Sequence, residues 1–388
     1  MGGAFSPVFD PGNNSSRGGT AMSTIRSFIK REPVLLAAAL AALLSCLPVP
    51  PDGEYLSYFD LRTLALLYCL MAVVSGLRTA GLFAHLAHVF CGHATSVRAM
   101  GLVLTLLCFF SAMLITNDVA LLTFVPFAVV VLGMADRRTD LIHIVVLQTA
   151  AANLGSMLTP VGNPQNLYLY SFYDLSFPEF VSILFPCSAL SLVLLTAACF
   201  LLSNEPLDLK LGEDPGVRLR RLWFYLGLFG VCLLTVVRVL PWPVMLGIVV
   251  LLLLTFDRKG LARADFMLLL TFAAFFIFAG NLARVEAVAA MIRQILAGRE
   301  YLTSLLASQV ISNVPAALLI ADFTDRFESL LLGVNIGGLG TPIASLASLI
   351  SLKLYAHSDH ARTGRYLAEF TVVNVLLLLL LSLLVLTL

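Results

Sequence analysis

Long apolar runs recur along this chain, and they constrain its fold more than any other feature. A transmembrane helix needs about 20 consecutive apolar residues, with a range of about 17–25. Of the 388 residues, 59% are hydrophobic and only 12% are charged. Soluble domains carry about 25% charged residues. So few charges cannot solvate a soluble globule of this size, which excludes a cytosolic enzyme, a secreted module and a nucleic-acid-binding protein. We therefore predict an all-α polytopic membrane protein.

Nine apolar runs are predicted to cross the membrane, and two more contain a polar turn. We interpret the latter two, 99–134 and 301–325, as re-entrant hairpins whose ends return to one side of the membrane. Residues 1–21 are rich in Gly, Ser and Asn, and residues 1–29 are predicted to form a disordered leader. The nine predicted spans are 33–49, 62–80, 141–170, 180–203, 222–240, 243–256, 266–282, 328–356 and 366–388.

The distribution of Lys and Arg predicts the orientation of the chain, because cytoplasmic loops carry an excess of these residues. With a cytoplasmic N-terminus and nine alternating spans, six of the 24 Lys and Arg residues fall outside and the other eighteen fall inside. We therefore predict a multi-pass protein of the bacterial inner membrane, with its N-terminus in the cytoplasm and its C-terminus outside.

The two halves of the chain repeat the same motifs. The segment Ile-Thr-Asn-Asp-Val-Ala-Leu-Leu at 115–122 resembles Ile-Ser-Asn-Val-Pro-Ala-Ala-Leu at 311–318, and 153–161 resembles 335–343 with the same Asn-to-Thr-Pro spacing. The offsets are 196 and 182 residues, close to half of the chain length. Each half has the order span, short amphipathic segment, hairpin, broken span and final span.

A lone connecting span between the repeats places the two halves in opposite orientations. Inverted repeats of this kind are typical of secondary transporters. The broken helices are predicted at 141–170 and 328–356. The predicted organisation is the leader, a first repeat at 30–205, a linker and connecting span at 206–242, and a second repeat at 243–388.

Both broken spans contain residues that interrupt a helix inside the membrane. Pro160 and Pro342 each remove a backbone N–H. Interrupted backbone survives in a bilayer only where it lines a cavity or is buried in protein. Freed carbonyls, together with Asn and Thr oxygens, would bind a hard cation, and the helix N-termini at the break would attract an anion. The alternative is that the small residues only allow helices to pack closely.

Asp118 is the one acidic residue that the predicted topology places near the bilayer centre. A charge there costs at least about 2.5–3.5 kcal/mol, which indicates a functional role. Asp118 would bind sodium as a carboxylate or carry a proton; the alternative is that it caps the helix that follows. The second half has Val314 at the equivalent position. No Lys or Arg is predicted to lie equally deep, so dipoles, hydroxyls, amides and bound cations would have to hold an anionic substrate.

Other polar residues carry weaker signals. His85, His88 and His93 have a spacing seen among metal ligands, but they lie on an amphipathic segment that favours an interfacial helix. Gln148 either reaches the pathway or forms a buried interhelical bond. The seven cysteines lack C-x-x-C spacing, which indicates apolar filling. The sequence contains no H-E-x-x-H, G-x-S-x-G or phosphate-binding G-x-x-x-x-G-K-[ST] motif, so we expect neither an enzyme nor an ATP-driven pump. A channel is the alternative from another class of protein.

The paired motifs resemble those of the ion transporter superfamily. This group includes the divalent-anion/sodium symporters with a citrate-transporter domain, the arsenite permeases and the NhaD-type sodium/proton antiporters. The resemblance covers about residues 30–388 and is carried by the I-T-N-D-V-A-L-L, G-N-P-Q-N, I-S-N-V-P and N-I-G-G-L-G-T-P segments. It implies sodium sites at the hairpin tips and helix breaks, a substrate between the tips, a homodimer and an elevator motion.

The resemblance leads us to expect a secondary active transporter that moves a small anion or oxyanion and is coupled to a cation, Na+ above all. The alternative is a Na+/H+ antiporter or an arsenite-type efflux permease that uses Asp118 as the exchanging carboxylate. Asp118 and Val314 replace threonines of the symporters, which weakens the case for a dicarboxylate substrate. The expected partners are the anion, Na+ or H+ as the coupling ion, the lipid bilayer and a second copy of the chain. We expect no nucleic acid and no resident cofactor.

The residues implied as Na+ ligands are Thr116, Asn117, Asp118, Asn153, Gly162, Ser312, Asn313, Asn335 and Gly340. The residues implied as substrate contacts are Thr116, Asn117, Asn163, Pro164, Ser312, Asn313, Thr341 and Pro342.

Overall fold

The computed structural model describes residues 32–135, 137–207, 214 and 216–387, so the predicted leader at 1–29 lies outside the described residues. The described residues are almost entirely helical, and their only β-type pairing is an isolated bridge between Ser96 and Pro206. Seven of the described helices are long and apolar enough to cross a membrane. The predicted all-α polytopic membrane fold is therefore confirmed.

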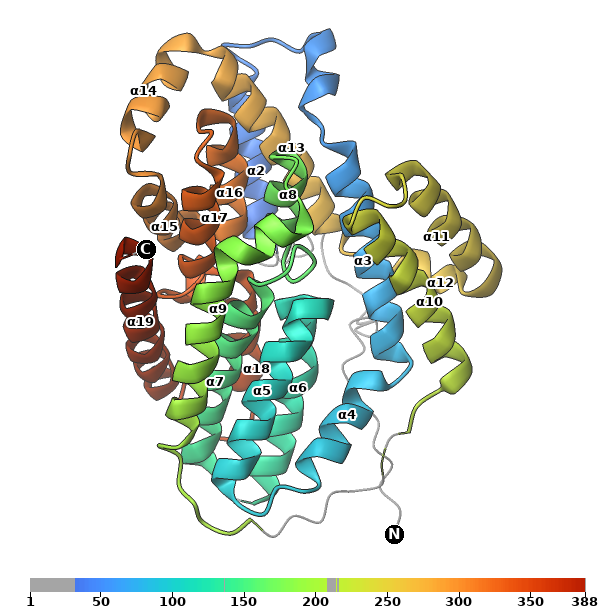
Figure 1. The fold of residues 1–388 in the computed structure, drawn as a ribbon, viewed down its shortest axis with the longest axis vertical. Helices are drawn as coiled ribbons and strands as arrows, with labels where there is room; N and C mark the ends of the chain where they lie inside the picture. Colours follow the sequence, from blue (N-terminus) through green and yellow to red (C-terminus); the bar gives the residue numbers. More distant parts are fainter. Residues whose placement is uncertain (1–31, 136, 208–213, 215, 388) are drawn as a thin grey trace, which may run out of the picture.

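The first half of the described chain extends from α2 to α9, and α10 is the helix that connects it to the second half (Figure 1). Its elements are α2 (Pro33–Ser45), η1 (Gly53–Tyr58), α3 (Leu61–Thr79), α4 (Leu82–Cys91), α5 (Val97–Ile115), α6 (Asn117–Met134), α7 (Arg138–Ser156), α8 (Pro164–Phe172), α9 (Phe177–Cys199) and the connector α10 (Leu219–Val236).

The second half repeats this order from α13 onward. Its elements are α11 (Trp242–Phe256), α12 (Arg258–Leu261), α13 (Phe266–Arg284), α14 (Glu286–Leu296), α15 (Glu300–Ile311), α16 (Asn313–Ile320), η2 (Ala321–Phe323), α17 (Phe327–Ile336), η3 (Pro342–Ala344), α18 (Leu346–Ala356) and α19 (Thr363–Thr387).

Two helix pairs turn back on themselves at the polar tips expected from the sequence. Thr116 is the single residue between α5 and α6, and Ser312 is the single residue between α15 and α16. The two pairs differ in length. Helices α5 and α6 have 19 and 18 residues, whereas α15 and α16 have 12 and 8. Each helix of the first pair is long enough to cross a bilayer by itself, which the interpretation of 99–134 as a re-entrant hairpin did not anticipate.

The two halves exchange their broken helices. Helix α7 ends at Ser156 and α8 begins at Pro164, while α17 ends at Ile336 and α18 begins at Leu346. Beyond its break, each half packs on the other half: α8 contacts α16 and α17, and α18 contacts α6 and α7. Figure 1 shows α5, α6 and α7 side by side below the breaks and α15, α16 and α17 above them. The two hairpins therefore approach the breaks from opposite ends of the molecule.

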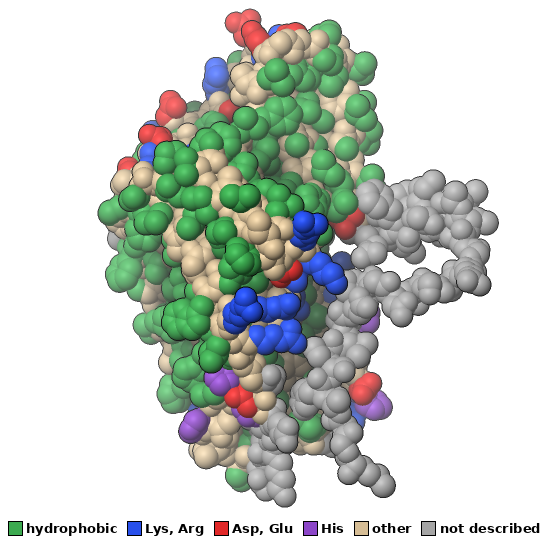
Figure 2. Space-filling view, turned by 90° about the vertical axis from the view of Figure 1, so that its right-hand side faces the viewer, with side chains coloured by type: hydrophobic (Ala, Val, Ile, Leu, Met, Phe, Trp, Pro, Cys, Tyr) green, Lys and Arg blue, Asp and Glu red, His purple; other side chains and the backbone are tan. Residues whose placement is uncertain are grey.

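A second layer of helices lies beside the hairpins. In this layer, α13 packs along α2, and α10 and α11 pack along α3. Figure 2 shows the face on the α10–α12 side, where apolar side chains cover the upper part and Lys and Arg side chains gather at mid-height. Large apolar side chains such as Leu43, Leu251 and Leu383 are exposed on α2, α11 and α19. Exposed apolar helix faces of this kind suit contact with lipid.

The short helix α4 joins the second layer to the first hairpin. Its N-cap, Gly81, has a φ of 93°, and a Cβ there would lie 2.6 Å from the carbonyl oxygen of Gly216. The Asp214 carboxylate pairs with His85 on α4 at 2.7 Å. The backbone N–H of Gly216 and the His85 ring hold the pKa of Asp214 below its usual range. These contacts fix the start of α4 against the residues that precede α10.

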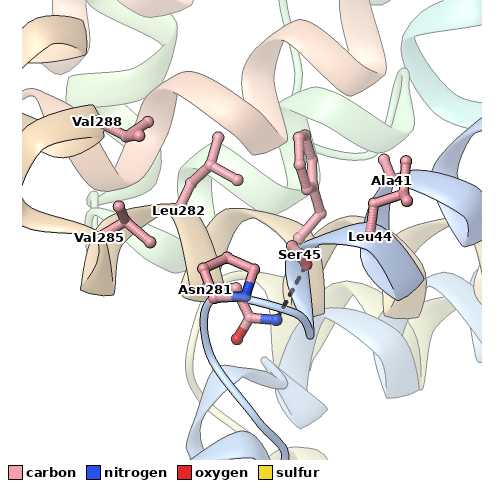
Figure 3. Close-up of a pocket in the computed structure, with 9 residues that line it drawn as sticks. Ala41, Leu44, Ser45, Asn281, Leu282, Val285 and Val288 are labelled. Atoms are coloured by element: carbon pink, nitrogen blue, oxygen red, sulfur yellow. Dashed lines mark hydrogen bonds between the residues drawn. The ribbon is translucent and has the colours of Figure 1, made fainter.

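A hollow of about 590 Å³ opens between α2 and α13 (Figure 3). Its walls are apolar side chains such as Leu44 and Leu282, and its main polar feature is Asn281, whose Nδ2 donates to Ser45 Oγ at 3.0 Å. None of its lining residues belongs to a hairpin tip or a helix break. An apolar hollow without a charged lining residue does not suit an anion or a cation, so we place the functional site elsewhere.

Candidate functional site

Both hairpin tips adopt the same unusual backbone conformation. Thr116 has φ 76° and ψ 145°, and Ser312 has φ 72° and ψ 154°. Residues other than glycine rarely occupy this region, and the conformation costs on the order of 1–3 kcal/mol. Such strain persists where the surrounding structure imposes it, and it clusters at functional sites. Its presence at equivalent positions of two repeats points to the tips as the functional centre.

The first tip is tied to the first helix break. Asn117 is buried, and its Nδ2 donates to Asn153 Oδ1 at 3.1 Å. The backbone N–H of Asn117 donates to the carbonyl oxygen of Gly162 at 3.1 Å. Its Oδ1 accepts from the backbone N–H of Asp118 at 3.0 Å. Asn117 therefore contacts the residues on both sides of the break.

The second tip lies against the second break in a similar way. Ser312 Oγ donates to the carbonyl oxygen of Ala344 at 3.4 Å. The Asn313 side chain lies over Gly338, because a Cβ at Gly338 would come within 2.9 Å of Asn313 Nδ2. Each tip is thus buried against the interrupted backbone of its own repeat.

Asn153, near the end of α7, binds the start of α18 in the other half. Its Nδ2 donates to Ser348 Oγ at 3.2 Å, and its Oδ1 accepts from Ser345 Oγ at 2.9 Å. Ser345 is the N-cap of α18, and it directly follows Ala344. The two tips are therefore joined through Asn117, Asn153 and the 344–345 segment.

Asn335, near the end of α17, makes the reciprocal contacts with the start of α8. Its Oδ1 accepts from Asn163 Nδ2 at 3.3 Å, and its Nδ2 donates to Asn166 Oδ1 at 2.7 Å. Asn163 is the N-cap of α8, as Ser345 is of α18. The offset of 182 residues that relates Asn153 to Asn335 also relates both bonded pairs. The result is a buried polar network with twofold pseudosymmetry.

The remaining predicted site residues differ in burial and backbone conformation between the two breaks. A Cβ at Gly162 would lie 2.0 Å from the carbonyl oxygen of Ser156, so this position requires glycine. Pro164 is buried as the first residue of α8. In the second break, Gly340 has a φ of 95°, Thr341 is exposed and Pro342 begins η3. The structure thus brings Asn163 and Pro164 into the buried network, whereas Thr341 and Pro342 lie at its open edge.

The Asp118 carboxylate is not a helix cap. The N-cap position of α6 falls on Thr116, whose side chain makes no capping bond, and the backbone N–H of Asp118 is bonded by Asn117 Oδ1. Among the described residues, Asp118 Oδ1 is a buried oxygen without a hydrogen-bond partner. A buried, unpaired carboxylate oxygen is unfavourable unless a ligand or a proton satisfies it.

Arg78 is a cation near the first tip that the sequence analysis did not place there. This residue is near the end of α3, and its guanidinium donates to the carbonyl oxygen of Leu122 at 3.4 Å. That carbonyl lacks its usual helical partner because position 126 is proline. Leu122 is one helical turn beyond Asp118, so a guanidinium from the second layer reaches the hairpin close to the tip.

Side-chain amides satisfy the carbonyls that the breaks set free. In the first break, Asn166 Nδ2 donates to the carbonyl oxygens of Met157 at 3.0 Å and Thr159 at 3.3 Å. In the second break, Gln309 Nε2 donates to those of Gly337 at 2.7 Å and Leu339 at 2.9 Å. These contacts, and those of the α18 serines, were missed from the sequence. Extending the 182-residue offset by a few positions would have paired Asn166 with Ser348.

Other polar residues act within the helix packing. Gln148 is buried, and its Nε2 donates to the carbonyl oxygen of Phe124 at 3.1 Å, which is the interhelical bond considered above. His143 on α7 pairs with Glu369 on α19. Within the described ranges, no group of three His, Cys, Asp or Glu residues is placed to hold a metal ion. The seven cysteines are free thiols, and most are buried.

Comparison with known proteins identifies the family. A family model described as citrate transporter matches residues 23–326. A Methanocaldococcus jannaschii protein named an uncharacterized transporter is 30% identical over 337 residues, covering 86% of this chain and 91% of that protein. The inner membrane protein YbiR of Escherichia coli is 30% identical over 302 residues, covering 76% of this chain and 80% of that protein. A silicon efflux transporter of Oryza sativa is 29% identical over 133 residues, covering 34% of this chain and 27% of that protein.

These matches confirm the resemblance seen in the motifs, and they agree with the apolar helices of the structure. Because the family match extends over most of the sequence, the chain belongs to the citrate transporter family of multi-pass membrane transporters.

Proposed function

We propose that this protein is a secondary active transporter that moves a small anion or oxyanion, coupled to a cation, by an elevator-type alternation of access. The observation that carries the proposal is the convergence of two strained hairpin tips on two exchanged helix breaks. Inverted repeats that meet at interrupted helices are the architecture of secondary transporters.

The chemistry of the network suits a small anion. Helices α6, α8, α16 and α18 all begin at the tips and breaks. Each helix N-terminus carries a partial positive charge and unsatisfied backbone N–H groups. The nearby side chains of Asn163, Ser312 and Asn313 are neutral hydrogen-bonding groups. Such a site can bind an oxyanion by helix dipoles and hydrogen bonds.

The first tip offers a place for the coupling cation. Asp118 supplies a carboxylate oxygen without a hydrogen-bond partner in the described chain, and the adjacent Asn117 donates to the amide oxygen of Asn153. A sodium ion prefers oxygen ligands, and a proton would neutralise the same carboxylate. The second candidate function, a Na+/H+ antiporter or an arsenite-type efflux permease, is favoured by the unpaired Asp118 oxygen.

The two-layer arrangement suits an elevator motion. Hairpins, broken helices, α9 and α19 would move as one body past the layer formed by α2, α3, α10, α11 and α13, with α4 and α14 as connectors. In this conformation, Asp174 pairs with Arg62 and Arg238 across the two layers. These ion pairs would have to break during the motion. We further propose a homodimer, a cytoplasmic N-terminus and an inner-membrane location.

Reconstitution into liposomes separates the two candidate functions. We expect uptake of an anion to require an inward sodium or proton gradient. An internal pH change driven by sodium alone, without any anion, would instead identify an antiporter. Thermal-shift measurements with sodium, lithium, citrate, succinate, sulfate, phosphate and arsenite would select the substrate to be used, because a bound ligand stabilises the folded state.

Replacing Asp118 by Asn is expected to flatten the pH dependence of transport or to weaken the apparent sodium affinity. The variant keeps the size of the side chain but removes its charge and its proton. The measurement is the initial uptake rate in proteoliposomes as a function of pH and of sodium concentration. An unchanged dependence on both would remove Asp118 from the coupling site and leave it a structural residue of α6.

A further inference from the structure

We infer that the start of α10 and the turn between α11 and α12 together bind the headgroup of an anionic phospholipid. This surface belongs to the second layer and is separate from the hairpin tips and the helix breaks. It carries five exposed cations that have no ion-pair partner among the described residues. These cations, which we call the basic patch, are Arg218, Arg220, Arg221, Arg258 and Lys259.

Side-chain contacts hold the two segments of the basic patch side by side. The ring of Phe224 on α10 contacts that of Phe256 on α11, with 5.7 Å between the ring centroids. The Tyr225 hydroxyl donates to Asp257 Oδ2 at 2.8 Å. A Cβ at Gly76 on α3 would lie 2.0 Å from the Tyr225 ring, so the glycine makes room for this tyrosine. Lys and Arg side chains accordingly gather at mid-height of this face in Figure 2.

The acidic residues nearest along the chain are engaged with other groups. Asp257, besides accepting from Tyr225, pairs with Arg263 at 3.0 Å. Asp265 is the N-cap of α13, and its Oδ1 accepts from the backbone N–H of Leu268 at 3.0 Å. Neither pairs with a member of the basic patch. Five positive charges therefore lie on two short segments, and an external anion complements them.

Apolar side chains continue from the basic patch along both helices. Leu219 and Trp223 are exposed on α10, the latter to 70%, and Leu251 and Leu254 are exposed on α11. Tryptophan is enriched at the headgroup level of membranes. Basic clusters beside transmembrane helices bind anionic headgroups, and arginine suits phosphate in particular. A phospholipid, with a phosphate next to its acyl chains, matches this surface better than a free anion does.

A bound headgroup would join α10 to the α11–α12 turn at the membrane surface. The five cations belong to the layer that the proposed function treats as stationary, and none lies on a hairpin or a broken helix. The lipid would thus hold that layer in place while the hairpins move past it. This consequence rests on the proposed elevator motion, whereas the binding of the lipid does not.

The chain provides a fluorescent reporter for the experiment, because Trp223 is two residues beyond Arg221 and the only other tryptophan is Trp242. The full-length Trp242→Phe protein is reconstituted into vesicles of phosphatidylcholine and phosphatidylglycerol. Bromine atoms on the acyl chains of one lipid or the other then quench Trp223 when that lipid is its neighbour. We expect the quenching to show a preference for phosphatidylglycerol over phosphatidylcholine of roughly tenfold or more.

The decisive variant combines Arg221→Gln with Lys259→Gln in the Trp242→Phe protein, so each segment loses one cation. The preference for phosphatidylglycerol should fall roughly tenfold. The control, Arg362→Gln with Arg365→Gln, removes the same charge from two exposed arginines at the start of α19, which are predicted to lie on the same side of the membrane. The control should keep the preference. Equal losses in both variants would indicate general surface charge and would overturn the inference.

Measurements with the basic patch intact decide the question if the patch variant does not fold. Equal quenching of Trp223 by the two brominated lipids would overturn the inference. Absence of quenching by either lipid would show that a second copy of the chain covers this face instead. Inorganic phosphate, compared with chloride at equal ionic strength, separates the lipid from the free ion. A preference that persists in phosphate supports the lipid, whereas its loss in phosphate alone would assign the patch to the free ion.

Discussion

Replacing Asn117 by Ala is expected to abolish cation-coupled uptake while leaving the protein folded in the membrane. The variant loses the donor to Asn153 and the acceptor for the backbone N–H of Asp118. Loss of such buried hydrogen bonds costs about 1–3 kcal/mol, a fraction of the stability of a folded domain. If a loss of about 3 kcal/mol falls on the binding free energy of the transported ligand, its affinity weakens roughly 100-fold. Uptake in proteoliposomes and thermal unfolding in detergent measure the two effects separately.

Asn374→Ala is the matched control for this prediction. Asn374 is a buried amide on α19, where its Nδ2 donates to the carbonyl oxygen of Phe370 at 2.9 Å. Its Oδ1 has no hydrogen-bond partner among the described residues, so its removal should lower the unfolding temperature no more than Asn117→Ala does and leave uptake near the wild-type rate. Asn313→Ala, at the second tip, should lose uptake as Asn117→Ala does. Normal transport kinetics in Asn117→Ala would reject the assignment of the tips as the functional centre.

Replacing Gly155 by Ala is expected to prevent the accumulation of folded protein. A Cβ at this position would lie 2.1 Å from the carbonyl oxygen of Phe109 and 2.7 Å from its carbonyl carbon. Both belong to the backbone of α5, so no side chain can move to make room. Overpacking typically costs about 1–3 kcal/mol, and a clash with backbone exceeds that range. The measurement is the yield of monodisperse protein after detergent extraction, with the unfolding temperature of any material obtained.

Gly230→Ala is the control for Gly155→Ala, and it is expected to fold normally. Gly230 is inside α10, and no heavy atom lies within 4 Å of a Cβ added there. The substitution should maintain the yield and raise stability by up to about 1 kcal/mol, because alanine has the higher helix propensity. Equal yields from Gly155→Ala and Gly230→Ala would contradict the close approach of α5 and α7.

The helices and their interruptions could be predicted from the sequence because local chemistry decides them. Proline lacks the N–H that a continuous helix needs, and the Asn163–Pro164 pair therefore begins α8. The internal repeat located both tips at single polar positions, Thr116 and Ser312, because equivalent residues share a conformation. The lengths of the apolar runs predicted the ends of the other helices to within a few residues.

The connections between the halves could not be predicted from the sequence. Asn153 binds Ser345 and Ser348, which follow it by more than 190 residues, and only the exchanged packing of α18 on α6 and α7 brings them together. The reach of Arg78 to the Leu122 carbonyl likewise depends on how α3 lies beside α6. Residue type and spacing do not specify such contacts, because they arise from tertiary packing.

The exchange of broken helices has a consequence for how such a chain evolves. A polypeptide made of one half alone would leave the asparagine before its break without the partners that the opposite half supplies. It would complete its network only by associating with a second copy inserted upside down in the same bilayer. Once fused, the halves constrain each other: a change at position 153 must be matched at 345 or 348, and a change at 335 must be matched at 163 or 166. Substitutions in one half should therefore be accompanied by substitutions at the bonded positions of the other half.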